Sequence, residues 1–227
     1  MAEQLGFHLP GITALGRDDF LVAPSNAVAV AMIENWQSWT NGKLALAGPE
    51  GAGKTHLAHV WAALCGAEVV AACDLPRRDI ADLAKSAVAV EDVHQIAGVV
   101  DAETALFHLH NLILAENQPL LLTGRNEPAN WGLKLPDLAS RMAGSQTAVL
   151  SQPDDSLLAA VLAKLFNDRQ IMPKPDVIPY LVPRIDRSFS AAQDIVAVLD
   201  AASLAEQRPL TRKLAAAVLD KTVTHKS

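Results

Sequence analysis

Short runs of apolar residues, in which apolar and polar positions do not alternate, mark the strands that we predict in the first two thirds of the chain. Four such runs cover Lys43 to Gly48, Val69 to Ala72, Ala87 to Val90 and Leu120 to Thr123. Strands that are apolar on both faces are typical of a parallel sheet covered by helices on both sides. Because stretches with helical spacing separate these runs, the pattern predicts a doubly wound parallel α/β sheet.

Apolar residues spaced three or four apart predict the helices around this sheet. The first helix is expected at residues 25–39, where Val28, Met32 and Trp36 recur every four positions. That spacing predicts that these three side chains face the core. Two further helical stretches lie at residues 56–64 and 102–116.

Beyond residue 152 the strand-like runs stop. Three helical stripes follow, at residues 157–165, 192–199 and 210–218, and together they predict a small helical domain. We therefore divide the chain into three predicted segments. They are a flexible N-terminal segment at 1–19, an α/β domain at 20–152 and a helical lid domain at 153–227.

The segment from Gly48 to Thr55 has the pattern GxxxxGK[ST] of a phosphate-binding loop, between a predicted strand and a predicted helix. Glycines let consecutive N–H groups face a phosphate, and the following helix directs its positive end to the same place. Lys54 is expected to reach the β- and γ-phosphates, and Thr55 to ligate Mg²⁺. The alternative is a glycine turn without a ligand. The residues predicted to contact ATP or ADP here are Pro49, Glu50, Gly51, Ala52, Gly53, Lys54, Thr55 and His56.

Polar residues end the next two predicted strands. Glu91 and Asp92 follow the run from Ala87 to Val90. Nucleotide hydrolysis needs one acid that holds the water shell of the metal and another that orients the attacking water. We therefore predict catalytic roles for both acids, with Glu91 also contacting Mg²⁺ through water; the alternative is a solvated strand end. The run that starts at Leu120 ends in the polar residues Thr123, Arg125 and Asn126, one of which is predicted to sense the γ-phosphate, with Thr123 as the nucleotide contact that we select.

Charge and apolar content narrow the class of protein. The 227 residues carry a formal charge of −6, so we expect no direct sequence-specific DNA binding. No run of about 18 apolar residues predicts a membrane span. Glu3 and Pro10 fall where a secretory signal would be basic and apolar, so we expect a cytoplasmic protein. His94, His108 and His110 lack a metal-ligand spacing.

Together, the phosphate loop, the acid pair and the segment from Leu135 to Arg141 resemble the AAA+ module of the bacterial replication initiator DnaA. The likeness covers nearly the whole chain and is greatest to the shorter members of that family, which inactivate DnaA. It implies an AAA+ P-loop domain with a five-stranded parallel sheet covered by helices, followed by a small helical lid. The segment from Phe20 to Asn26 resembles the part that wraps adenine, which implies nucleotide contacts for Val22 and Asn26.

Arg141 corresponds to an arginine finger in this resemblance. Such a residue is donated across a subunit interface to the nucleotide of a neighbour, where its fixed donors stabilise developing phosphoryl charge. The alternative is an arginine that interacts with the negative end of its own helix.

The N-terminal residues Gln4 to Leu9 resemble the peptide with which such proteins dock on the replicative sliding clamp, the β subunit of DNA polymerase III. A terminus of this kind would bind in extended form, with a polar anchor at Gln4 and apolar side chains in a pocket. The alternative is an ordinary frayed terminus. The residues predicted to bind the clamp are Gln4, Leu5, Phe7 and Leu9.

Two positions depart from the family pattern. Arg125 lies where the family usually has an acidic residue, two positions after Thr123. Ser190 lies where the second sensor motif, which starts at Arg184, usually has its arginine. Because serine cannot make a charge-assisted contact with the γ-phosphate, we expect weaker closure of the lid on ATP. Arg187 is the candidate substitute at the nucleotide.

The resemblance implies a nucleotide-binding regulator of replication initiation that docks on the clamp and promotes hydrolysis of ATP bound to DnaA. Its own hydrolysis would be weak or dependent on a partner, and the DNA-box-binding domain of DnaA would be missing. The first alternative is a self-sufficient AAA+ ATPase of the helicase-loader or clamp-loader type. A P-loop kinase for a small metabolite is the second, and a homodimer remains open.

Overall fold

The computed structural model of the chain describes residues 21–206 and 208–224. The centre of this part is a five-stranded sheet whose neighbouring strands all pair in parallel, with the strand order β2-β3-β4-β1-β5. The predicted α/β architecture with a five-stranded parallel sheet is confirmed. The strands are β1 (Lys43–Ala47), β2 (Glu68–Ala71), β3 (Val88–Glu91), β4 (Leu120–Gly124) and β5 (Gln146–Val149).

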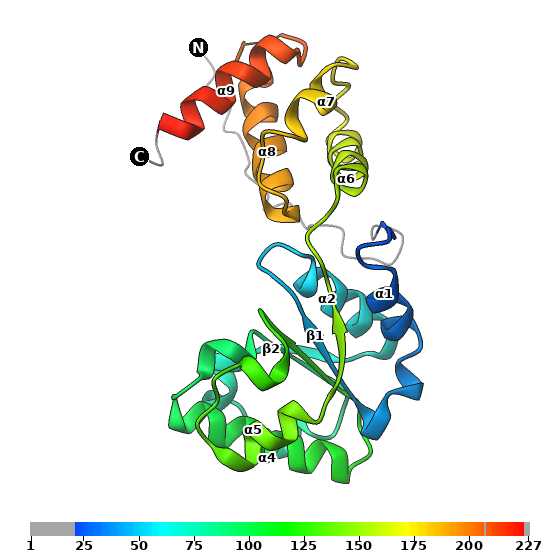
Figure 1. Cartoon of the computed structure of the whole chain (residues 1–227), viewed down its shortest axis with the longest axis vertical. Coiled ribbons are helices and arrows are strands. Elements are labelled where there is room, and N and C mark those ends of the chain that lie inside the picture. The colour runs from blue at the N-terminus through cyan, green and yellow to red at the C-terminus, as the bar shows by residue number, and fades with distance from the viewer. Residues whose placement is uncertain (1–20, 207, 225–227) are drawn as a thin grey trace, which may run out of the picture.

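Helices cover both faces of the sheet, as Figure 1 shows. Leu44 and Leu46 of β1 pack against one helical layer, and Ala45 between them packs against the other, which is the alternation expected of an extended strand. The first layer contains α1 (Ala27–Glu34) and α2 (Lys54–Cys65). The second contains α3 (Ile80–Leu83), α4 (Val100–Ala115) and α5 (Pro136–Ala143). Short 3₁₀ turns are η2 (Trp36–Ser38), η3 (Thr40–Gly42), η4 (Ala72–Arg77), η5 (Val93–Ile96) and η6 (Pro128–Asn130).

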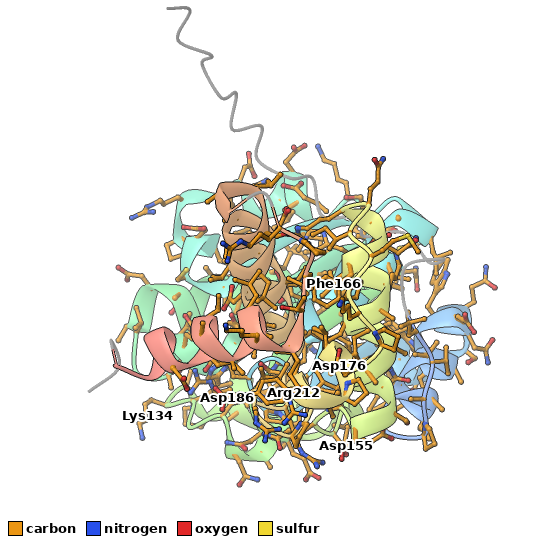
Figure 2. All side chains as sticks on the ribbon, turned by 90° about the horizontal axis from the view of Figure 1, so that it is seen from above. Lys134, Asp155, Phe166, Asp176, Asp186 and Arg212 are labelled. Carbon is orange, nitrogen blue, oxygen red and sulfur yellow. The ribbon has the colours of Figure 1, made fainter. Side chains whose placement is uncertain are left out.

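The C-terminal helices form a separate lobe beyond the sheet (Figure 1). They have an apolar cluster of their own, in which Phe166 is almost fully buried. In Figure 2, which looks down on this lobe, Phe166 lies between α6 (Asp155–Asp168) and α8 (Phe189–Glu206). No helix among residues 21–206 and 208–224 has both the length and the apolar character needed to cross a membrane. The helices are α6 (Asp155–Asp168), α7 (Val177–Leu181), α8 (Phe189–Glu206) and α9 (Arg212–Thr224).

The first helix differs from the prediction. It ends at Glu34, and its buried face consists of Ala29, Val30 and Ile33, whereas Val28 is 68% exposed. The large side chains of Val28, Met32 and Trp36 suggested a different buried face. Alanine contributes little to a hydrophobic pattern, but its small side chain lets a helix pack close to its neighbour. The prediction that Val28 faces the core is therefore wrong.

The strand β5 (Gln146–Val149) does not stand out in the sequence as an apolar run. It lies at the edge of the sheet, pairs only with β1 in the described part of the chain, and has one buried residue, Ala148. An edge strand of this kind carries polar side chains, so its pattern resembles that of a loop.

Candidate functional site

The phosphate loop joins the carboxyl end of β1 to the start of α2, as predicted. Gly51 and Gly53 have φ of +72° and +92°, in the left-handed region that glycine adopts without strain. A Cβ atom on Gly48 would lie 2.5 Å from the carbonyl oxygen of Leu150. The glycines of the motif are therefore required by the backbone path, and α2 begins directly behind the loop at Lys54.

The side chain of Lys54 lies across the phosphate loop. Its Nζ donates hydrogen bonds to the carbonyl oxygens of Gly48 and Pro49, both at 2.8 Å. Burial lowers the pKa of Lys54, and the negative charge of Asp92 opposes this shift. A charged donor bonds more strongly to an anionic oxygen than to a neutral carbonyl. The ammonium group is thus placed to exchange these acceptors for a phosphate.

A cavity of about 510 Å³ lies between the phosphate loop and the C-terminal helices. Val161, Leu165 and Phe189 contribute apolar surface from α6 and α8. The other side is formed by the loop residues Glu50, Gly51, Gly53, Lys54 and Thr55. Pockets for small ligands typically measure about 300–1,000 Å³ and combine apolar walls with a few polar groups. The cavity therefore has the size and lining of a nucleotide pocket.

The two acids at the end of β3 lie near Lys54, and their negative charges oppose the lowering of its pKa by burial. The backbone N–H of Asp92 donates to the hydroxyl of Thr123, 3.0 Å away, which joins the ends of β3 and β4. One oxygen of Glu91, Oε1, is buried without a hydrogen-bond partner among the described residues. A buried carboxylate oxygen of this kind suits the water shell of a metal ion. Together with the Thr55 hydroxyl, these residues fit Mg²⁺.

Arg125, which departs from the family pattern, pairs with the phosphate loop. Its Nη2 lies 2.5 Å from Glu50 Oε2, and both side chains are largely exposed. Both residues line the cavity, so the positive charge of Arg125 is paired with the negative charge of Glu50 there. Exposed pairs of this kind contribute little to stability.

The segment before α1 contributes to the cavity through Leu21 rather than Val22. Asn26 accepts a hydrogen bond from the Ala23 amide at 2.8 Å and donates one to the Leu21 carbonyl at 2.9 Å. It thereby fixes the turn that places Leu21 in the cavity lining. Val22 is 52% exposed and lies outside that lining. Contacts of Val22 and Asn26 with a nucleotide stay a prediction.

The start of α8 contacts the phosphate loop directly. The Phe189 amide donates to the Gly51 carbonyl at 2.9 Å. A Cβ atom on Gly51 would lie 2.3 Å from the Cβ of Ser188. Arg187, the proposed substitute sensor, pairs with Asp155 at 2.6 Å and lies outside the lining of the main cavity. Arg187 instead lines a second pocket together with Glu50 and Ser190, and its contact with a nucleotide stays a prediction.

Arg141 lies at the other end of the sheet. It is exposed, in the last turn of α5, and its guanidinium carbon is 5.2 Å from the centre of the Phe107 ring. Its carbonyl oxygen accepts a hydrogen bond from Lys43, the first residue of β1, whereas the phosphate loop follows the last. Five residues of strand separate these points by roughly 16 Å. The predicted clamp-binding residues Gln4, Leu5, Phe7 and Leu9 lie outside the described residues.

Three buried polar residues near α5 have no functional signal in the sequence: Lys43, Glu103 and His110 are 6%, 2% and 2% exposed. The carboxylate of Glu103 accepts hydrogen bonds from the backbone amides of Gly98, Lys134 and Leu135. The sequence gives one hint for this group, because Lys43 is a charged residue at the start of an apolar run.

Comparisons with known proteins agree with this architecture. No protein-family model matches the chain. It resembles domain III of Thermotoga maritima DnaA with a TM-score of 0.78 and 16% identity, over 91% of this chain and 96% of that one. Aquifex aeolicus DnaA bound to AMPPCP gives 0.68 and 18%, over 80% and 63%. The FIGL-1 AAA domain in complex with ADP gives 0.62 and 13%, over 86% and 78%.

The chain spans almost all of the DnaA domain III structure but less than two thirds of the longer DnaA chain. Identities of 13–18% show a shared fold and no more. The protein has the AAA+ fold of DnaA domain III.

Proposed function

We propose that the chain binds ATP or ADP in the cavity between the phosphate loop and the C-terminal helices. The loop amides and Lys54 would hold the phosphates, while Leu21 and the apolar residues of α6 and α8 would enclose the rest of the nucleotide. Thr55, with Glu91 through water, would hold Mg²⁺, which neutralises phosphate charge. Two of the similar structures contain a bound nucleotide or nucleotide analogue, which supports this assignment.

We further propose that the chain regulates replication initiation by promoting hydrolysis of ATP bound to DnaA, as the inactivator Hda does. The observation that carries this proposal is the position of Arg141, exposed on α5 at the end of the sheet opposite its own phosphate loop. There the guanidinium is available to a nucleotide held by a neighbour. The shared fold with DnaA supports the proposal that the two proteins pack head to tail, as subunits with heterologous interfaces do.

The predicted result of Arg141→Ala is a loss of about 10³-fold in stimulated hydrolysis of DnaA-bound ATP. The guanidinium would no longer stabilise charge on the transferred phosphoryl group. The rate is measured with DnaA, the parent chain or its variant, and sliding clamp loaded on DNA. Arg77→Ala serves as the control, because Arg77 has an 83% exposed side chain and pairs only with Asp74 among the described residues. Full stimulation by the Arg141→Ala protein would exclude the finger role.

Docking on the sliding clamp through Gln4 to Leu9 is the second part of this proposal, and it rests on the sequence alone. Immobilised clamp should capture the intact chain and lose it when Gln4 and Leu5 are both changed to alanine. Glu3→Ala is the control in the same segment, because Glu3 directly precedes the proposed peptide without being part of it. Unchanged capture of the double variant would place the contact elsewhere.

The alternative function is a self-sufficient ATPase. Glu91, Asp92 and Thr123 favour it, because they lie together at the strand ends beside the phosphate loop. Steady ATP turnover by the purified chain, abolished by Glu91→Gln, would support this function. The regulatory proposal expects little turnover by the chain alone and a large rise when DnaA and loaded clamp are added.

A further inference from the structure

The helix that carries Arg141 is held at both ends by buried charged side chains from other elements. Near its start, Glu103 of α4 accepts the amides of Lys134 and Leu135, the latter at 2.6 Å. Near its end, Lys43 of β1 donates to the carbonyl oxygen of Arg141 at 2.7 Å. Neither contact follows from helix formation itself, because both partners lie on other elements.

Lys43 is an unusual residue for its position. It is 6% exposed, in a strand whose five residues are all buried. Burial lowers the pKa of Lys43, and repulsion from Arg141 lowers it further. Removing an ammonium group from water is costly unless hydrogen bonds replace the lost hydration. An apolar residue would fill the same place in the sheet without this cost, so packing does not explain the lysine.

His110 supplies the second acceptor for Lys43. Its Nε2 lies 3.3 Å from Lys43 Nζ, and its Nδ1 lies 3.4 Å from the side-chain oxygen of Asn111. Burial, followed by the charge of Lys43, lowers the pKa of His110 to about 4, so the ring is neutral at pH 7. A neutral imidazole has one acceptor nitrogen, and this network assigns that role to Nε2. The lysine is thereby directed at two acceptors.

The carbonyl of Arg141 belongs to the last turn of α5, where backbone oxygens lack a partner within the helix. The described residues offer it two side-chain donors, Lys43 at 2.7 Å and the more distant hydroxyl of Ser145 at 3.4 Å. Because the carbonyl and the side chain share one residue, fixing this oxygen fixes the point from which the guanidinium extends.

We propose that Lys43 is a positioning residue for Arg141, with His110 directing its ammonium group. This inference rests on the proposed function, in which Arg141 acts on the nucleotide of a neighbour. A donor that is already in place does not have to be ordered during the reaction. Displacement of such a group by about 1 Å can cost about 10²-fold in rate. Lys43 acts on catalysis without touching the nucleotide.

The test compares Lys43→Met with the parent in hydrolysis of DnaA-bound ATP, at increasing concentrations of the chain. Methionine keeps the length and fills the buried site but cannot donate a hydrogen bond, and apolar residues of similar volume often replace buried charges without loss of stability. The maximal rate should fall at least about tenfold. The half-saturating concentration should stay within about twofold, because the exposed surface of α5 is unchanged. Lys85→Met, at an exposed lysine paired with Asp82, should match the parent.

A maximal rate equal to the parent's would overturn the role of Lys43. A purely structural role predicts a different pattern, in which the half-saturating concentration rises and the melting temperature falls together with the rate, and that pattern would overturn it as well. If Lys43→Met does not fold, Lys43→Leu is measured in the same way with the same expected outcome. Absence of stimulation by the parent chain would instead refute the proposed function itself.

Discussion

The two ends of the sheet hold their polar residues in different ways. At the phosphate loop, consecutive residues from Gly48 to Thr55 form the site, and Lys54 bonds to neutral carbonyls that a phosphate can replace. At the opposite end, Lys43 of β1 holds the carbonyl oxygen of Arg141, and His110 of α4 lies beside the lysine, so these partners are already in place. The comparison teaches that one end is arranged to accept a ligand, while the other is arranged to present a side chain.

The largest effect is expected from Lys54→Ala, which acts on the ligand-accepting end. Loss of the ammonium group should weaken ATP or ADP binding about a thousandfold, or about 4 kcal/mol, because a charged contact to phosphate is removed. Isothermal titration calorimetry measures the affinity. The control is Lys85→Ala, which removes an exposed lysine and should leave the affinity unchanged. Unaltered nucleotide binding by the Lys54→Ala protein would remove the functional difference between the two ends.

A smaller effect, on stability rather than binding, is expected from Glu103→Gln, because the carboxylate of Glu103 binds the backbone amides just before α5. Although burial raises the pKa of Glu103, hydrogen bonds from the amides of Lys134, Gly98 and Leu135 outweigh it and lower the pKa. The neutral amide places an N–H group against these donors, which should cost about 3 kcal/mol.

Urea unfolding measures this loss of stability. Glu116→Gln, at an exposed glutamate that follows α4, is the matched control and should unfold like the parent. If Glu103→Gln changed the free energy of unfolding as little as Glu116→Gln does, Glu103 would not fix the start of α5.

The smallest of these effects is a pH dependence that His110 adds to stability. Its folded pKa of about 4 lies below the ordinary value of 6.5, so the unfolded chain binds a proton more readily. The contribution is fully present above pH 6.5 and is lost as the pH falls towards 4. At pH 5 the loss amounts to about 2 kcal/mol. His110→Gln should remove this part of the difference between pH 7 and pH 5, whereas His108→Gln, at an exposed position, should keep it.

The same contrast explains what the sequence could predict. The phosphate loop and four of the five strands were predictable because each depends on neighbouring residues. The contacts of Lys43 with Arg141, of Glu103 with Leu135 and of His110 with Lys43 were not, because they join residues that are 98, 32 and 67 positions apart along the chain. A buried charge of this kind has no local pattern, and its partners come together only when the sheet and the helices α4 and α5 have packed.

The central claim is that the phosphate loop serves the chain's own nucleotide while Arg141 serves that of a neighbour. It is tested most directly by a single round of hydrolysis of labelled ATP preloaded on DnaA, with loaded clamp and either Glu91→Gln or Arg141→Ala. The account predicts that the Glu91→Gln protein stimulates hydrolysis like the parent and that the Arg141→Ala protein does not. Stimulation by Arg141→Ala together with its loss in Glu91→Gln would contradict the account.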